Sequence, residues 1–311
     1  MLKYILKRIG IAAMTVLIII VILFFLLKLM PGSPFNNERL SEDQVATLNE
    51  KYGLDKPLPQ QIVVYIKNMM TGDFGVSYSI QQNYPVASLI ASRYPTTIRI
   101  GLQAYVLGVL LGLVLGIIAA LNHNKPLDTG TTIFAMIGNS IPSQVLALAF
   151  VYFLAFKAGL FPLTYDSNNV AASSFLPVLA LSIGPMAMTA RFTRNEMIEV
   201  MDSEYILLAE TKGMARLKVV GLHGLKNTLV SLITTLGPMV MGLLTGSTVA
   251  EQIFAIPGIG SLFIKAIQNN DYNVVISLAF IYSVMYIGII LFIDIMYGII
   301  DPRIRLAGGK K

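Results

Sequence analysis

The chain has 311 residues, of which 55% are hydrophobic and only 13% are charged. A soluble domain carries about 25% charged residues, so the composition excludes an ordinary water-soluble protein and predicts that lipid is part of its solvent. The chain lacks cysteine, which excludes disulfides and thiolate metal sites, and its two histidines are too few for a histidine metal cluster.

The first apolar run extends from Ile9 to about Leu29 and follows three basic residues, Lys3, Lys7 and Arg8. A cleavable signal peptide would have an apolar core of about 7–15 residues and a small-residue cleavage site. Because this run is longer and offers no such site, we predict a retained first transmembrane helix in residues 1–30, with its N-terminus in the cytoplasm.

Residues 31–96 form a polar segment with both charge signs, which we predict to be a small extracellular insert with short helices. Ser41 is a suitable cap for a helix that stops at Gly53. A second amphipathic stretch, from Gln60 to Met70, is closed by a Thr-Gly-Asp sequence.

Five further apolar runs make up a predicted permease core in residues 97–311. Each is close to the roughly 20 residues that a helix needs to cross a hydrocarbon core. The runs cover about residues 97–121, 131–156, 175–192, 227–250 and 274–300. We therefore predict an all-α, polytopic membrane protein with six transmembrane helices. Three of the spans contain helix-breaking prolines, at Pro142, Pro185 and Pro238, so these spans are expected inside a bundle.

The distribution of charge predicts the orientation. With the N-terminus inside, the short inner segments hold ten basic residues: Lys125, Arg194, Lys212, Arg216, Lys218, Lys226, Arg303, Arg305, Lys310 and Lys311. The short outer segments hold only Lys157 and Lys265. This positive-inside asymmetry places both termini in the cytoplasm. It also accounts for the net charge of +6 without nucleic acid as a partner.

Glycines recur every four residues in the second span, at Gly108, Gly112 and Gly116. This spacing permits close approach of another helix. We favour packing within this subunit, although contact with a second subunit would need the same pattern.

The sequence contains no recognisable catalytic constellation. It lacks a phosphate-binding Gly-x-x-x-x-Gly-Lys-Ser/Thr loop, a Gly-x-Ser-x-Gly elbow and a His-Glu-x-x-His motif. We predict no catalytic residues, no metal site and no enzymatic activity. Arg99, Arg191 and Asp294 are ionisable residues within apolar runs and leave open an ion-coupled secondary transporter. Interfacial anchoring or an ion pair between helices is the simpler interpretation.

The inner segment from residue 193 to 226 is the most informative. Residues Glu204 to Lys212 predict a short helix that stops at Gly213. Tyr205, Leu208 and Ala209 are spaced to share one face. From the residues alone, this face could lie on lipid headgroups or dock a soluble partner.

This segment resembles the EAA loop of ABC importer permeases, and specifically that of the peptide and nickel branch. The matching residues are Tyr205, Ala209, Lys212, Gly213, His223, Leu225 and Asn227. Leu207 and Leu208 replace the general motif's Glu-Ala, and its later Ile-x-Leu-Pro is missing. Further similar stretches run in order along nearly the whole chain, from Met30-Pro-Gly-Ser-Pro-Phe to Asp301-Pro-Arg-Ile-Arg. The long insert resembles that of the oligopeptide permease B-type subunit.

The resemblance implies a subunit of an ATP-driven importer that takes up oligopeptides across the bacterial cell membrane. It implies a heterodimeric pore with a homologous C-type permease, two ATPase subunits and an extracellular peptide-binding lipoprotein. ATP and Mg²⁺ would be bound by the ATPase subunits, and this chain would bind no cofactor. Nickel chelates or dipeptides are the alternative substrates within the family.

The resemblance also assigns roles to residues. Coupling to the ATPase is expected at Tyr205, Leu208, Ala209, Glu210, Lys212 and Gly213. An outer gate loop, residues 251–273, is expected to hold a re-entrant or interfacial helix and to contact the binding protein through Glu251, Phe254, Pro257, Gly258, Asn270 and Asp271. The alternative is a structural plug that only packs the bundle. Independently of the resemblance, Met239, Met241, Thr245 and Thr248 in the fifth span are candidates for an adaptable pore wall, since Met accommodates varied shapes; ordinary helix packing is the alternative.

Overall fold

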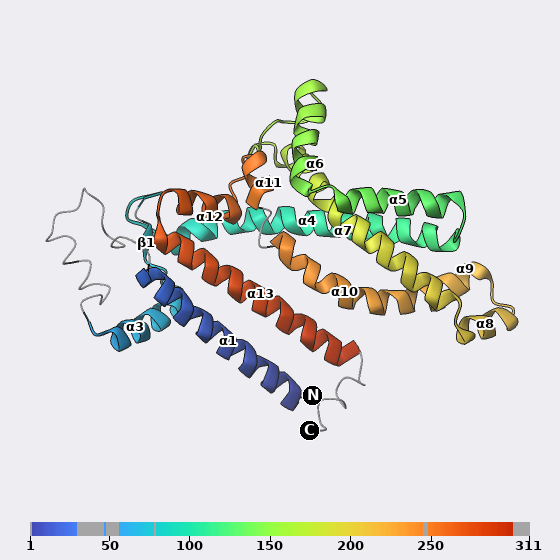
Figure 1. The fold of residues 1–311 in the computed structure, drawn as a ribbon, viewed down its shortest axis with the longest axis horizontal. Coiled ribbons are helices and arrows are strands. Elements are labelled where there is room, and N and C mark those ends of the chain that lie inside the picture. The colour runs from blue at the N-terminus through green and yellow to red at the C-terminus, as the bar shows by residue number, and fades with distance from the viewer. Residues whose placement is uncertain (1, 30–46, 48–55, 78, 245–247, 301–311) are drawn as a thin grey trace. The chain divides into compact units, whose positions relative to one another are not determined.

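The computed structural model of the chain is almost entirely helical and describes residues 2–29, 47, 56–77, 79–244 and 248–300 (Figure 1). The elements in chain order are α1 (Leu2–Leu29), α3 (Leu58–Thr71), β1 (Val76–Ser77), β2 (Tyr84–Pro85), α4 (Val86–Leu121), α5 (Pro126–Ser140), α6 (Ser143–Phe150), the π-helix η1 (Val151–Lys157), α7 (Val170–Met201), α8 (Glu204–Thr211), α9 (Arg216–Val219), the π-helix η2 (Val220–Leu225), α10 (Lys226–Leu244), α11 (Thr248–Ile253), α12 (Ile259–Gln268) and α13 (Tyr272–Ile300). The two short strands form an antiparallel pair.

Four helices, α1, α4, α7 and α13, are long and apolar enough to cross a membrane. The pair formed by α5 and α6–η1 passes the same test together, which gives up to five spans in the described part of the chain. These segments correspond to five of the six predicted runs. The remaining run, residues 227–250, includes α10 and the start of α11, and its residues 245–247 lie outside the described ones, so a sixth span stays a prediction. Two helices exceed their predicted bounds, because α4 begins within the insert at Val86 and α7 continues to Met201.

The predicted third span is broken rather than continuous. Its two halves are bent by 96° on either side of Ile141-Pro142. Ile141 has extended backbone angles (φ −88°, ψ 122°), as expected for a β-branched residue that precedes proline. By contrast, α7 runs through Pro185 without ending. It also runs through Pro177, which follows Leu176, so the residue before the proline does not decide whether this helix continues.

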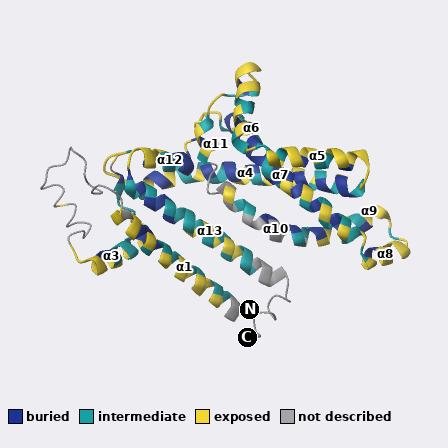
Figure 2. Ribbon diagram, in the orientation of Figure 1, coloured by how far each residue is buried: buried dark blue, intermediate teal, exposed yellow. Residues whose placement is uncertain are grey.

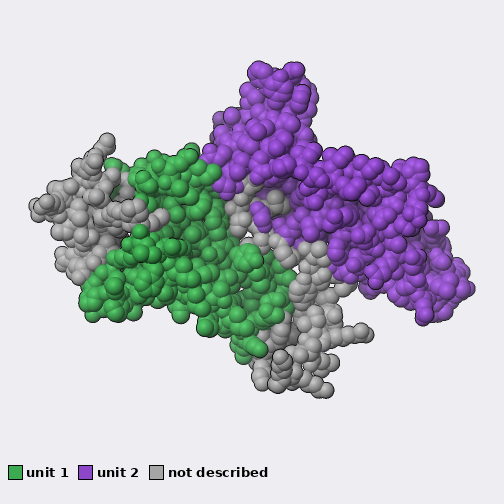
Figure 3. All heavy atoms as spheres, viewed as in Figure 1, with its two compact units in different colours: residues 1–95, 257–311 green, residues 96–256 purple. Residues whose placement is uncertain are grey.

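Contacts divide the chain into two compact units (Figure 3). Unit 1 comprises residues 1–95 and 257–311, and unit 2 comprises residues 96–256. The predicted division into a first helix, an insert and a core follows the order of the chain and stays a prediction.

In unit 1, α1 packs along α13 and α3 packs beside α1. Buried Ile20, Met69 and Phe280 are part of one core that joins these three helices. The amphipathic stretch predicted from Gln60 is confirmed as α3. It ends at Gly72 with φ +77°, a left-handed conformation that favours glycine. Except for Thr47, the helix predicted between Ser41 and Gly53 lies outside the described residues.

In unit 2, the glycine face of α4 packs against α7 of the same chain. A Cβ added at Gly112 would lie 2.6 Å from the carbonyl oxygen of Met186, and one added at Gly116 would lie 2.5 Å from Thr193 Cβ. No side chain larger than hydrogen fits at these distances. The packing of Gly108, Gly112 and Gly116 within this subunit is therefore confirmed, and buried positions follow the length of α7 (Figure 2).

Candidate functional site

The short helix α8 forms as the sequence predicts. Ser203 has an extended backbone before the first turn, and Glu204 places a negative charge near the positive helix end. At the other end, Gly213 adopts φ +76°. Its N–H donates to the carbonyl of Glu210 at 2.9 Å, so the glycine closes the helix and turns the chain toward α9.

One face of α8 is packed against the body of the protein. Ile206 and Ala209 are only 1% and 6% exposed. They form a small core with Val219 of α9, to which Met201 and Met214 contribute. Ala209 therefore lies on the buried side of the helix and not on the face with Tyr205 and Leu208. Its small side chain lets α9 approach closely.

The opposite face of α8 is apolar and exposed. Tyr205, Leu207 and Leu208 are 44%, 62% and 55% exposed. The exposed residues Glu204, Glu210 and Lys212 supply charge beside them. Leu207 was not among the predicted coupling residues, although it is more exposed than Leu208. An apolar centre with a charged rim is the usual pattern of a protein–protein interface.

The segment that follows α8 is fixed to both α8 and α7. The side-chain amide of Asn227 donates to the Tyr205 hydroxyl at 3.2 Å and to the carbonyl of His223 at 3.0 Å. Gly224 in η2 packs so closely on α7 that an added Cβ would lie 2.9 Å from Met197 Cε. Tyr205, His223 and Asn227, which the family resemblance selects, thus come together in the structure.

The predicted outer gate loop contains two helices, α11 and α12. Glu251 of α11 is buried and accepts a hydrogen bond from the Thr97 hydroxyl at 2.7 Å. Phe254 is fully buried in the core of unit 2, and its carbonyl accepts from the backbone N–H of Tyr165 at 2.8 Å. These two side chains lie inside unit 2. Pro257 is exposed, whereas Gly258 is buried.

Asp271, at the junction of α12 and α13, is completely buried. Its carboxylate accepts hydrogen bonds from the Ser77 hydroxyl and from the backbone N–H groups of Ser79 and Ile80, the last two at 3.1 and 3.2 Å. Asp271 therefore binds the insert from within unit 1. The neighbouring Asn270 is exposed, so of these two residues it alone is placed to reach a partner.

The predicted pore-lining residues are described only in part. Met239 and Thr248 are half-buried, whereas the Met241 side chain and Thr245 lie outside the described residues. A pore-lining role for these four residues stays a prediction.

Two of the ionisable residues in apolar helices have polar partners. Asp294 of α13 pairs with Arg8 of α1 at 2.8 Å, which is the ion pair between helices that was the simpler interpretation. Arg99 donates to the Tyr165 hydroxyl at 2.7 Å. Arg191 is exposed. Within the described ranges, no group of His, Cys, Asp or Glu side chains could hold a metal ion.

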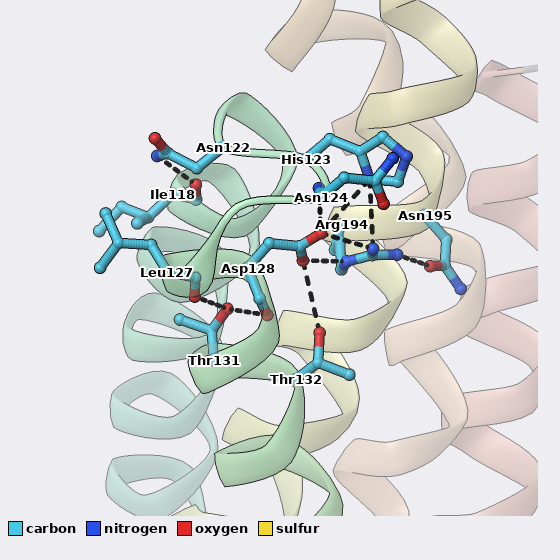
Figure 4. A network of polar contacts seen from close by, with 10 residues as sticks. All are labelled: Ile118, Asn122, His123, Asn124, Leu127, Asp128, Thr131, Thr132, Arg194 and Asn195. Atoms are coloured by element: carbon cyan, nitrogen blue, oxygen red, sulfur yellow. Dashed lines mark hydrogen bonds and ion pairs between the residues drawn. The ribbon is translucent and has the colours of Figure 1, made fainter.

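A polar network that sequence reasoning missed surrounds Asp128, near the start of α5 (Figure 4). Arg194 of α7 contacts both carboxylate oxygens of the buried Asp128, with Nε at 2.5 Å and Nη2 at 2.8 Å. The backbone N–H of Asn124 donates to the same carboxylate at 2.9 Å, and His123 Nδ1 lies 3.3 Å from it. The sequence Lys-Pro-Leu-Asp signals a helix start, but nothing in it identifies Arg194, which lies 66 residues away.

Comparisons with known proteins agree with this architecture. Residues 112–306 match the family described as binding-protein-dependent transport system inner membrane component, and residues 1–101 match its N-terminal counterpart. The dipeptide transport system permease protein DppB of Lactococcus lactis is 42% identical over 98% of this chain and 100% of its own length. The oligopeptide transport system permease protein OppB of Haemophilus influenzae is 40% identical over the same shares.

A solved structure of the MetNI methionine ABC transporter has a similar fold. Its TM-score is 0.58 at 16% identity, over 69% of this chain and 97% of the other. The apolar helices and this fold define the class, a polytopic α-helical membrane protein, and the relatives identify it as a permease. The chain belongs to the family of binding-protein-dependent transport system inner membrane components. It is a multi-pass protein of the bacterial plasma membrane.

Proposed function

We propose that this chain is one of two pore-forming subunits of an ATP-driven importer for oligopeptides. It would have six transmembrane helices with both termini in the cytoplasm. Its partners would be a homologous C-type permease, two ATPase subunits and an extracellular peptide-binding lipoprotein. ATP and Mg²⁺ would be bound by the ATPase subunits alone. The relatives named as dipeptide and oligopeptide permeases support the substrate class.

The exposed apolar face of α8 is the observation that carries this proposal. A helix of eight residues cannot be stable by itself in water, and α8 is held by its buried side and by the Tyr205–Asn227 hydrogen bond. Two adjacent leucines are left facing outward. Burying them in a groove of a soluble subunit would remove their apolar surface from water. Docking there would couple this chain, which has no recognisable ATPase site of its own, to ATP hydrolysis by its partner.

Coupling would then proceed by rigid-body movement. Closure of the ATPase subunits around ATP would displace α8, and α8 is joined to α7 by only Asp202 and Ser203. A displacement of α8 would therefore pull on the inner end of a helix of 32 residues. Such rocking of helices around a central site is the general mode of alternating access.

On the outer side, we propose that the loop of residues 251–273 helps to close the pore and meets the binding protein at Asn270. The chain has no cysteine, so a single Asn270→Cys substitution gives a unique attachment point for a crosslinker. We expect a crosslink to the binding protein, and none from Glu199→Cys, an exposed position on the inner half of α7. No crosslink from Asn270→Cys in any nucleotide state would contradict the contact.

Reconstitution tests the function as a whole. The chain would be co-purified with its second permease and ATPases, inserted into liposomes and supplied with the binding protein and labelled peptides. We expect uptake only with ATP and binding protein present, and competition by oligopeptides. If only dipeptides or only nickel chelates compete, then that class of compound is the substrate in place of oligopeptides. Uptake driven by an ion gradient without ATP would favour a secondary transporter instead.

A further inference from the structure

Asp128 and Arg194 join two helices that otherwise touch through small side chains. The apolar contact between α5 and α7 is built from Ala135, Ala187 and Ala190, with Leu115 of α4 beside them. Gly138 extends this contact, since a Cβ added there would lie 3.0 Å from Ile183 Cγ2. Small side chains interlock weakly, so this surface alone fixes the register of α5 on α7 poorly.

The ionic contact supplies the register that the alanines do not. A guanidinium and a carboxylate that meet through two parallel hydrogen bonds define distance and orientation together. The N–H of Asn124 holds the carboxylate from the other side, and Asp128 is buried. A buried ion pair contributes little net stability but is costly to break by removing one partner. Geometric precision is therefore the better account of this pair than stability.

The inner end of α7 also carries the contacts of α8 and η2. Met201 belongs to the core beneath α8. Met197 contacts Gly224, and its sulfur accepts a hydrogen bond from the buried Thr228 hydroxyl at 3.5 Å. Arg194 lies one turn before Met197 on the same helix. The ionic contact at Arg194, the contacts of η2 and α10 at Met197 and the contact of α8 at Met201 thus lie on consecutive turns of α7.

We propose that Asp128 and Arg194 are positioning residues that make α5 move with α7 when the ATPase displaces α8. The displacement would then reach α6–η1, which continues α5 beyond the break at Pro142 (Figure 4 shows the pair at the start of α5). Without the pair, α7 slides along the alanine contact and α5 stays behind. The inference rests on the proposed coupling role of α8.

The first test measures coupling in the complete complex. Asp128→Asn, Arg194→Gln and the double variant are compared with Arg191→Gln. Arg191 lies one turn earlier on α7. It is exposed and has no ion pair among the described side chains. We expect the ATP hydrolysed per peptide imported to rise about fivefold or more in the first three variants. The double variant should be no worse than either single one, because the residues act as a unit.

Arg194→Lys completes the set, since it keeps the charge but loses the two-point geometry. A ratio of ATP hydrolysed to peptide imported that lies between the wild type and Arg194→Gln supports positioning. If one of the other variants fails to assemble, Arg194→Lys is measured in its place. An unchanged ratio, with ATPase and uptake lowered equally, would mean that the pair serves stability alone and would overturn the inference. The same rise in Arg191→Gln would overturn it too.

A second readout does not depend on the identity of the substrate. Spin labels at Ile133→Cys on α5 and Glu199→Cys on α7, both exposed positions of a chain without cysteine, report the distance between the two helices. We expect this distance to stay constant between the nucleotide-free and ATP-bound complex, and to change in the Arg194→Gln background. A constant distance in both backgrounds would contradict the inference. Failure of peptide uptake in the wild-type complex would instead contradict the proposed function.

Discussion

The hydroxyl of Tyr205 accepts a hydrogen bond from the side-chain amide of Asn227 at 3.2 Å. Tyr205 belongs to the short helix α8, and Asn227 lies in the first turn of α10. The contact therefore ties the exposed helix to the segment that leads back toward the membrane. A helix fixed in this way presents Leu207 and Leu208 at a defined position, which a docking surface requires.

Replacing Leu208 by glutamate should strongly weaken docking of the ATPase. A charge in the middle of an apolar contact must be desolvated without a partner. Losses at central interface residues reach about 2 kcal/mol or more, so we expect the affinity for the ATPase to fall about 30-fold or more. Pull-down of the ATPase by the solubilised permease measures the effect.

Leu160→Glu is the matched control for Leu208→Glu. Leu160 is another exposed leucine, in the loop after η1. We expect ATPase binding to be unchanged in this variant. If Leu208→Glu binds as well as the wild type, α8 is not the docking helix.

Replacing Gly213 by aspartate should leave the subunit in the membrane but separate ATP hydrolysis from uptake. Gly213 has a left-handed backbone at the negative end of α8, where an added carboxylate is repelled. Asparagine tolerates the same backbone without the charge, so Gly213→Asn should be milder. The ratio of ATP hydrolysed to peptide imported distinguishes the two. Normal ATPase and normal uptake in Gly213→Asp would refute this role.

The sequence predicted the elements whose signals are local. The bounds of α8, the stop at Gly213 and the close packing of Gly112 follow from spacing, capping and size, each of which is visible within one or two helical turns. The exposed docking face was predicted in part. The i, i+4 spacing placed Ala209 on the same face as Tyr205, whereas in the structure Ala209 is buried and Tyr205 is exposed. Which side of α8 is buried depends on where α9 folds back, and spacing alone does not show this.

Contacts between distant segments could not be predicted in this way. Asp128 and Arg194 are 66 residues apart, and Ser77 and Asp271 are 194 residues apart. In each pair, a charged residue at a helix end is explained locally by the helix dipole, so nothing in the sequence demands a distant partner. The burial that turns such a charge into a structural contact appears only when the helices are packed.

Replacing Gly112 by valine should destabilise unit 2. A Cβ at this position would lie 2.6 Å from both the Met186 carbonyl and Thr189 Cβ, so α4 and α7 would have to separate. Overpacking of this kind costs about 1–3 kcal/mol, which thermal unfolding in detergent would show as a lower Tm. Gly130→Ala is the control, because a Cβ there meets nothing within 4 Å. A Tm as high as the wild type's for Gly112→Val would mean that the two helices are not in contact.

Replacing Asp271 by alanine should release the insert from the rest of unit 1. The change leaves the Ser77 hydroxyl and the N–H groups of Ser79 and Ile80 without their carboxylate. Of these donors the Ser77 hydroxyl is buried, and leaving a buried donor unsatisfied costs about 1–3 kcal/mol. We therefore expect a lower Tm and faster proteolysis within the insert.

Two variants isolate the carboxylate of Asp271 as the cause. Asp271→Asn keeps one acceptor oxygen and should fall between alanine and the wild type. Asn270→Gly changes the exposed neighbour, whose φ of +53° glycine adopts without strain, and should have no effect. If proteolysis of the insert is equally slow in all three variants, then the hydrogen bonds of Asp271 do not hold the insert. Other contacts of the insert within unit 1 would then be sufficient, such as its hydrophobic packing on α1, α12 and α13 and the hydrogen bond that Asn273 donates to the Val76 carbonyl.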